Sequence, residues 1–131
     1  MIEIYKKSVI TRLGSDDKAP YLIRLSLINT PWFSLKLHRI LLSDDDCMHD
    51  HPWTFISFIL KGGYVEQTPA GKKLYGPGSV LYRPAKFIHR LEIYQPAITL
   101  VITFKKVREW GFITPKGWIE WFRYTPSNRC E

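Results

Sequence analysis

The chain is organised around one stretch, Asp44-Asp45-Asp46-Cys47-Met48-His49-Asp50-His51-Pro52-Trp53. Its centre is a pair of histidines one residue apart, His49 and His51. Successive side chains of a β-strand point to opposite faces, so on a strand these two imidazoles share one face and Asp50 takes the other. Two neutral imidazoles side by side can form half of a metal site. The alternative is a pair that only hydrogen-bonds to backbone near the end of a strand.

A chain of 131 residues predicts a single domain that spans residues 1–131. The hydrophobic share of 45% and the aromatic share of 15% are ample for a packed core, which excludes the disordered class. No apolar run approaches the roughly 20 residues of a membrane helix, and the first residues lack an apolar stretch of signal-peptide length. We therefore expect a cytoplasmic protein without membrane contact, and free thiols at Cys47 and Cys130.

The net charge of +7 and the pI near 9.5 favour anionic partners such as nucleic acid, phosphorylated small molecules or nucleotide sugars. The basic pairs at 6–7, 72–73 and 105–106 lie in different segments, however, and no nucleic-acid motif accompanies them. We expect a basic surface that keeps the protein soluble and a small-molecule ligand, with no nucleic-acid partner.

Short apolar stretches alternate with turn signals every 8–12 residues or so, which is typical of an all-β sandwich or barrel. No segment keeps a 3.6-residue apolar period for three turns, so no helix is expected. A loop is expected at 14–20 from its composition. The expected strands are 2–10, 21–28, 32–42, the segment from the histidine pair to 60, 64–68, 79–83, 87–94, 97–104, 109–113 and 118–124.

Within these strands the alternation separates a polar face from an apolar one. Arg24 and Ser26 share the polar face of one strand, and Lys36 and His38 share that of the next. The run from 53 to 60 is apolar on both faces, as in a strand buried between two sheets. Turn signals are expected at Lys61-Gly62-Gly63, as a hairpin turn, and at 69–73, 76–78 and 114–117.

A third histidine, His89, follows Gly78 and Pro84 at spacings of eleven and five residues. Together with the His49–His51 pair and a glycine at 62 or 63, this spacing resembles the two motifs of the cupin superfamily. A longer set of residues looks like a group of small single-domain cupins from bacteria and phages. That set is His38-Arg39, Asp44, His49 to Trp53, Gly62 to Tyr64, His89-Arg90, Trp110 to Phe112, Pro115 and Gly117-Trp118.

The resemblance implies a double-stranded β-helix, the jelly-roll barrel of cupins. It also implies that His49, His51 and His89 converge inside the barrel and bind a divalent metal ion: Fe, Mn, Ni or Zn. Many cupins add a glutamate four residues after the second histidine, and here that residue is Phe55. We therefore expect a three-histidine site with open positions, as in the thiol dioxygenases of the superfamily.

Further carboxylates are expected to play a smaller part. Glu66 and Glu92 could supply an oxygen ligand, but solvated surface charges are the expected state of both. Asp44, Asp46 and Ser57 are candidates for orienting the imidazole rings because they are near in sequence. A solvated turn for the two aspartates and a small packed residue for the serine are the expected states.

Substrate contacts are expected from polar or amphipathic residues near the motif strands. One or two of these are expected to line the pocket and to hold an anion, while Trp53 should wall the cavity because it shares the parity of His49 and His51. The residues are Tyr64, Tyr82, Arg39, Arg83 and Trp53. The aromatic residues Trp110, Phe112, Trp118 and Trp121 are expected to pack a core or a subunit contact.

Three functions remain open at this point. The first is a metal-dependent, dioxygenase-like oxidoreductase acting on a small, anionic substrate. The second is a metal-free isomerase or epimerase of a nucleotide sugar, with a histidine as base. The third is a non-catalytic cupin that binds a small molecule. No catalytic residue is assigned. Pairing of edge strands predicts a homodimer.

Overall fold

The computed structural model describes residues 3–10, 20–44, 46–125, 127 and 130, with side chains from residue 7 onward. The loop expected at 14–20 lies, apart from Pro20, outside the described residues. The described chain forms ten strands and one 3-10 turn, as the all-β expectation requires. They are β1 (Glu3–Ile10), β2 (Leu22–Asn29), β3 (Phe33–Ile40), β4 (Met48–His49), β5 (Phe55–Thr68), β6 (Gly71–Tyr75), β7 (Val80–Arg83), β8 (Arg90–Phe104), β9 (Gly111–Thr114), β10 (Gly117–Glu120) and η1 (Trp121–Arg123).

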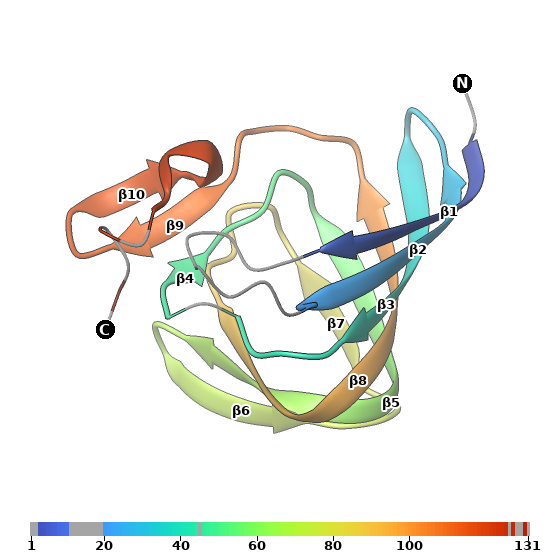
Figure 1. Ribbon diagram of the computed structural model, residues 1–131, viewed down its shortest axis with the longest axis horizontal. Coiled ribbons are helices and arrows are strands. Elements are labelled where there is room, and N and C mark those ends of the chain that lie inside the picture. The colour runs from blue at the N-terminus through green and yellow to red at the C-terminus, as the bar shows by residue number, and fades with distance from the viewer. Residues whose placement is uncertain (1–2, 11–19, 45, 126, 128–129, 131) are drawn as a thin grey trace.

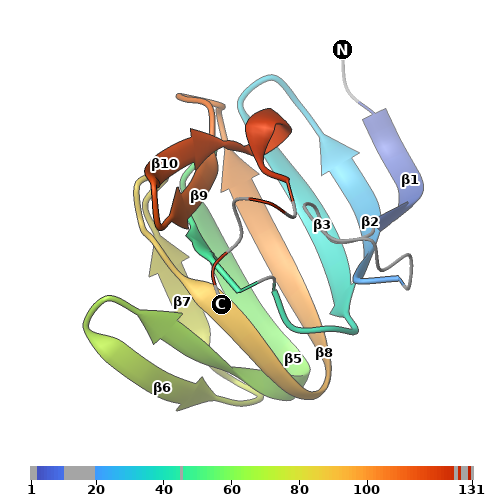
Figure 2. The ribbon, with the colours of Figure 1, turned by 60° about the vertical axis from the view of Figure 1, so that its left-hand side comes forward.

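The strands form two antiparallel sheets. The larger has the order β1-β2-β3-β8-β5-β6, with β7 paired to β5, and the smaller has the order β10-β9-β4. The large sheet bends round through the long strands β5 and β8, and the small sheet lies beside its concave side (Figures 1 and 2). Residues of both sheets line one cavity. This is the jelly-roll arrangement that the sequence predicts.

The buried side chains form two clusters, one on each sheet. One cluster lies at one end of the large sheet and contains Leu22, Ile40, Ile59, Tyr64, Leu81 and Ala97. The other lies under the small sheet and contains Cys47, Phe112 and Tyr124. The Phe112 and Tyr124 rings stack with their centroids 3.8 Å apart. The contact buries the apolar faces of both rings, and that burial is its contribution to stability.

The hairpin turn expected at residues 61–63 is wrong, because β5 continues through this segment as a bulge. The register between β5 and β8 shifts between Ile59 and Tyr64. Gly62 has φ +71°, and a Cβ there would lie 2.1 Å from the Pro96 carbonyl oxygen. Glycine is required because it allows this conformation and this close approach of two backbones.

The same bulge explains why the two strands expected at 87–94 and 97–104 are one continuous strand, β8. Pro96 lies in the middle of β8 and has no N–H to donate to a neighbouring strand. It lies opposite the irregular stretch of β5, where Lys61 pairs with Ile98 and Gly63 with Gln95. A proline is tolerated inside a sheet at such a bulge, so it does not end the strand.

The expectation of free thiols is also wrong. Cys47 and Cys130 form a disulfide that joins the start of β4 to the C-terminal segment, across a sequence separation of 83 residues. Both cysteines pack with Phe112 and Tyr124. The cysteines are far apart in sequence, so the sequence contains no sign of this pairing. They meet because the closing hairpin β9–β10 folds back onto β4.

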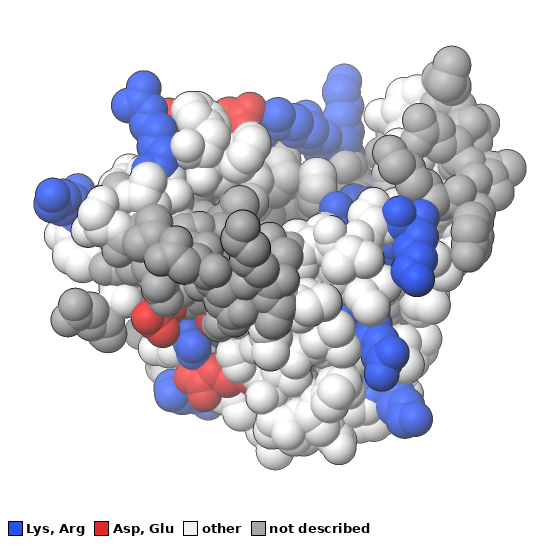
Figure 3. All heavy atoms as spheres, in the orientation of Figure 1, with Lys and Arg blue, Asp and Glu red and all other residues white. Residues whose placement is uncertain are grey.

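Within the described residues, no helix is long and apolar enough to cross a membrane. On the face shown in Figure 3, lysine and arginine side chains stand in several separate places and form no single patch. This distribution agrees with the scattered basic pairs of the sequence.

Candidate metal centre

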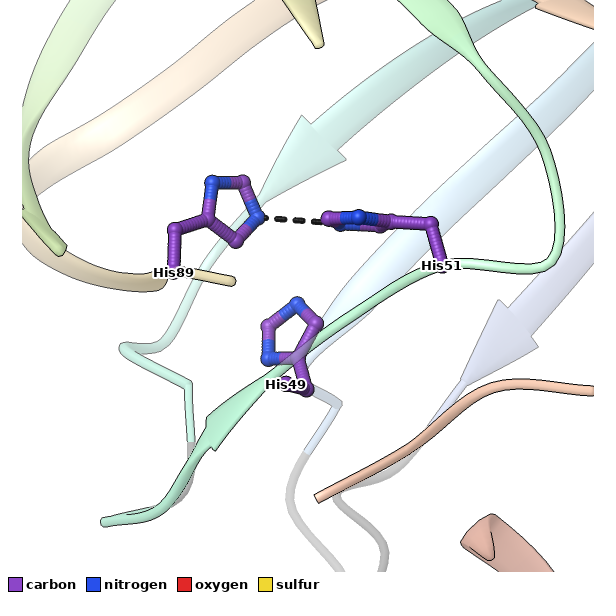
Figure 4. A group of neighbouring side chains, drawn as sticks. All are labelled: His49, His51 and His89. Atoms are coloured by element: carbon purple, nitrogen blue, oxygen red, sulfur yellow. Dashed lines mark hydrogen bonds between the residues drawn. The ribbon is translucent and has the colours of Figure 1, made fainter. Parts of the chain in front are cut away.

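Three histidines from two segments of the chain, His49 and His51 from one and His89 from the other, meet at one point. Their candidate ligand nitrogens all lie within 4.8 Å of one another, and no other group of three or more metal-ligating side chains occurs among the described residues. The Nε2 atoms of His51 and His89 are 3.1 Å apart. The ring centroid of His49 lies 5.2 Å from that of His51 and 5.0 Å from that of His89. Figure 4 shows the three rings facing one another.

Backbone pairing brings these side chains together. His49, at the end of β4, and His89, just before β8, exchange two N–H···O bonds of 2.9 and 3.0 Å. The N–H of His51 donates to the Ala85 carbonyl at 2.9 Å. Because directly opposed residues of an antiparallel pair present their side chains on the same face, this register places the third imidazole beside the first two.

The ring of His89 is oriented by a buried ion pair. Its Nδ1 lies 2.7 Å from Glu66 Oε2, and Arg83 binds the same carboxylate with two N–H groups, at 3.0 and 2.6 Å. Burial by itself would raise the pKa of Glu66, but the hydrogen bonds from His89 and Arg83 outweigh it and lower the pKa to about 2. An ionised Glu66 holds the proton on Nδ1, so Nε2 of His89 presents its lone pair to the other histidines.

The ring of His49 faces a second buried carboxylate. Asp44 Oδ2 lies 3.8 Å from His49 Nδ1 and accepts the Leu91 backbone N–H at 2.8 Å. The Tyr21 hydroxyl donates to the other oxygen of Asp44. The expectations of solvated charges at Glu66 and at Asp44 are therefore wrong, because both carboxylates are buried among donors.

The other carboxylate and hydroxyl candidates agree better with their expected states. Asp46 is exposed and Ser57 is a small buried residue. Glu92 lies near the surface, where it forms ion pairs with Lys72 and Arg90, both at 2.9 Å. None of these three side chains belongs to the group of ligating atoms.

Burial favours the neutral form of the His49 and His51 rings. It lowers the pKa of His49 to about 4 and that of His51 well below 6.5. Nδ1 of His51 is buried and has no hydrogen-bond partner among the described residues. The nearby Phe87 backbone raises the pKa of His51, but burial lowers it by more. Neutral imidazoles with their lone pairs turned to one point are the ligands that divalent first-row metal ions take. The residues present therefore fit such an ion.

The three histidines form part of the wall of a cavity of about 380 Å³. Trp53, Phe55 and Tyr64 also line it, and burial raises the pKa of Tyr64, so that its phenol stays protonated. Aromatic walls around a few polar groups are typical of small-molecule sites. The structure therefore places two of the expected substrate contacts, Trp53 and Tyr64, beside the histidines.

The other three expected contacts lie elsewhere. Tyr82 is 60% exposed, and Arg39 is exposed on the outer face of β3. Arg83 is engaged with Glu66, behind His89, and does not line the cavity. These residues are close in sequence to the motif strands. Whether each one reaches the cavity depends on which face of its strand turns inward, and the sequence does not give that.

Sequence reasoning missed three cationic or titratable residues inside the large sheet. Arg24, Lys36 and His38 lie on the polar faces of β2 and β3, and these faces turn inward. Arg24 and His38 line the cavity of the three histidines, and Lys36 is only 9% exposed. The alternation in the sequence could have identified these residues as a group, because it places them on one face of their strands and the leucines on the opposite face.

The aromatic residues of the closing hairpin contribute both packing and cavity wall. Trp110 and Phe112 line the cavity, each with its ring centroid 6.0 Å from that of His49. Trp110 also stacks on Trp121, with centroids 6.3 Å apart. Trp118 donates its indole N–H to Asp50 at 3.0 Å. These contacts explain how the small sheet covers one side of the three histidines.

The sequence matches no family model and no curated protein. Solved structures resemble the fold. A cupin-2 domain protein from Rhodospirillum rubrum aligns with TM-score 0.67 and 13% identity, over 86% of this chain and 78% of that chain. The polyketide cyclase RemF from Streptomyces resistomycificus aligns with TM-score 0.62 and 18% identity, over 79% and 80%. The iron(II) form of HppE aligns with TM-score 0.59 and 15% identity, over 76% and 57%. At these identities the likeness shows a shared fold.

Proposed function

We propose that this chain, which has the cupin fold, is a metal-dependent enzyme in which His49, His51 and His89 bind a divalent ion. The observation that carries the proposal is the meeting of three imidazoles, with candidate ligand nitrogens within 4.8 Å of one another, in the wall of a cavity. The orientation of His89 by Glu66 supports it, because metal-binding histidines usually donate their second nitrogen to a carboxylate or carbonyl.

Three imidazoles leave the full charge of the ion and several of its coordination positions available. A bound ion would supply Lewis-acid chemistry or, if it is iron, redox chemistry with O₂. The chain itself supplies the remaining functions. Glu66 and Arg83 hold the proton on His89 Nδ1, and Trp53 and Phe55 limit the access of water to the cavity.

A dioxygenase-like oxidoreductase acting on a small, anionic substrate is the form of this proposal that we favour. The likeness to iron(II) HppE supports an iron-compatible fold, and the likeness to a polyketide cyclase shows that the same fold is compatible with other chemistry. Iron, manganese, nickel and zinc all suit imidazole ligands, so the identity of the ion has to be measured.

The test is metal analysis of the untagged protein, followed by titration with iron(II), manganese, nickel and zinc. The chain contains four histidines, which gives a matched control. We expect one equivalent of ion in the wild type and in His38→Gln, and loss of binding in His49→Ala, His51→Ala and His89→Ala. Failure of all four metals to bind the wild type would overturn the proposal.

Two other outcomes would assign another function. Tight binding of nucleotide sugars by a metal-free preparation would favour an isomerase or epimerase. Stoichiometric metal without O₂ consumption, across a panel of small anionic compounds, would favour a non-catalytic binding protein.

We also propose that the protein is a homodimer and that it is cytoplasmic, a compartment in which a disulfide such as Cys47–Cys130 is rare. The large sheet ends in β1 on one side and β6 on the other, and an open edge can pair with a second copy. Light scattering should give twice the chain mass of 15.4 kDa, and a monomer would contradict this part. Cell fractionation would test the cytoplasmic location.

A further inference from the structure

Two cationic side chains lie on the inner face of the large sheet, on neighbouring strands. In the register of β2 and β3, Arg24 pairs with His38 and Ser26 pairs with Lys36. Because side chains alternate between faces along a strand, Arg24 and Lys36 project to the same side. Lys36 is 9% exposed, and Arg24 is also partly buried. This places two positive charges in the interior.

Neither cation has a carboxylate partner among the residues that the structure describes. Arg24 donates from Nε to His38 Nε2 at 3.0 Å, and Lys36 Nζ lies 4.1 Å from the centroid of the Trp53 ring. The two carboxylates that line the neighbouring cavity are already engaged by other donors. Asp44 accepts from Leu91, and Asp50 accepts from Gly111.

The two positive charges destabilise each other. Burial lowers the pKa of Arg24, and burial together with the charge of Arg24 lowers the pKa of Lys36 to about 8. Burying a charge without a partner is costly, and folded proteins rarely retain such a group unless something compensates it. An arginine with its remaining N–H groups free to form a bidentate contact, next to a lysine, matches a carboxylate or phosphate.

Two cavities lie beside these cations: Arg24 lines both, and Lys36 lines the second. The first holds the three histidines and has largely aromatic and aliphatic walls. The second, also about 380 Å³, is lined by Arg24 and Lys36 and by Lys105 and Lys106, and its described lining residues include no aspartate or glutamate. Arg24 and Trp53 line both cavities, so the two spaces adjoin at these residues.

We propose that Arg24 and Lys36 form an oxyanion-binding subsite, which holds the carboxylate or phosphate group of a small molecule whose apolar body extends toward the three histidines. This inference rests on the proposed function only in naming the substrate class; the subsite itself needs no metal. His38 is a positioning residue here, because its neutral ring accepts the Arg24 Nε–H and fixes the direction of the guanidinium.

The test measures binding of hexanoate, hexyl phosphate and inorganic phosphate to the full-length protein by calorimetry at constant ionic strength, with hexanol as the neutral comparison. We expect at least one of the anions to bind and hexanol to bind about tenfold more weakly or not at all. The tighter of the carboxylate and phosphate arms identifies the group that the subsite takes. No saturable binding of any anion would overturn the inference.

Variants separate this subsite from general attraction to a basic protein. Arg24→Gln and Lys36→Met should each weaken anion binding by about tenfold or more. Arg39→Gln, on the outer face of β3, is the matched control and should bind as the wild type does. Lys36→Arg, which keeps the charge, should retain binding within a few-fold, so a loss in Lys36→Met that arises from misfolding can be recognised. Equal binding by all four variants would contradict the subsite.

His49→Ala distinguishes failure of this inference from failure of the proposed function. That variant should lose the metal and keep the anion, because the subsite needs no ion. Loss of anion binding in His49→Ala, with retention in Arg24→Gln and Lys36→Met, would mean that the anion binds at the histidines, which overturns the subsite and leaves the metal proposal standing. Anion binding by a wild type that takes up no metal would support the subsite alone.

Discussion

Nδ1 of His89 and Oε2 of Glu66 lie 2.7 Å apart in the interior, on strand segments that are 23 residues apart in sequence. Arg83 completes the arrangement by binding both oxygens of the same carboxylate. The contact determines which nitrogen of His89 carries the proton, and therefore which nitrogen can bind an ion. Glu66, which is not itself among the ligating side chains, would thus affect how tightly the site binds an ion.

Glu66→Gln should weaken metal binding by about 10- to 100-fold, because the neutral amide holds the His89 proton less firmly. Competition against a colorimetric chelator measures the change in affinity. Glu92→Gln is the matched control, since Glu92 also forms ion pairs but lies near the surface. Wild-type affinity in Glu66→Gln would show that the contact only packs the interior.

Asp50→Asn should destabilise the fold, because the Asp50 carboxylate ties the histidine segment to the closing hairpin. It accepts the Gly111 N–H at 2.7 Å and the Trp118 indole N–H at 3.0 Å, and it pairs with Arg108. We expect the free energy of unfolding of metal-free protein to fall by about 2–4 kcal/mol in urea titrations. Asp46→Asn, at an exposed position, should change it little. Equal stability of the two variants would be inconsistent with this role.

The disulfide between Cys47 and Cys130 predicts two results. Mass spectrometry after alkylation without reductant should show no modified cysteine. Reduction should lower the free energy of unfolding by about 2–4 kcal/mol, because it releases a cross-link between distant parts of the chain. The double variant Cys47→Ser/Cys130→Ser is the control, and a reductant should leave its stability unchanged. Alkylation of both thiols in unreduced protein would show that the cysteines are free.

The stability of the protein should fall in mild acid partly through His38. Burial, with the charges of Arg24 and Lys36, lowers the pKa of His38 to about 3, against about 6.5 in the unfolded chain. Above pH 6.5 the ring is neutral in both states and contributes nothing. Between these two values only the unfolded chain takes up the proton, so the free energy of unfolding falls as the pH falls.

His38→Gln removes this titrating group while its amide oxygen can still accept from Arg24. From about pH 6.5 down to about pH 5, the wild type should lose on the order of 1–2 kcal/mol more than His38→Gln. Urea unfolding at several pH values measures the difference. Parallel pH profiles would mean that His38 is protonated in the folded protein.

Much of the strand pattern could be predicted from alternation and turn residues. The stop at Pro84 and the turn at 114–117 lie where composition predicts them, whereas the turn expected at 69–73 is shorter, because β6 already begins at Gly71. The error at Gly62 has a physical cause, because a turn and a bulge both need glycine and differ only in the strand that lies opposite. The same holds for Pro96, which ends a strand in isolation but is tolerated opposite the bulge.

The sequence by itself determined the all-β class and the identity of the three clustered histidines, because the alternation of short strands with turns and the spacing of a motif are local properties, although β4 ends at His49 and His51 lies beyond it. Only the tertiary structure decided that Glu66 and Asp44 are buried beside His89 and His49, and that Cys47 meets Cys130. It also decided that Arg24 and Lys36 face inward. Alternation separates the two faces of a strand, but the curvature of the whole sheet determines which face encloses the cavity.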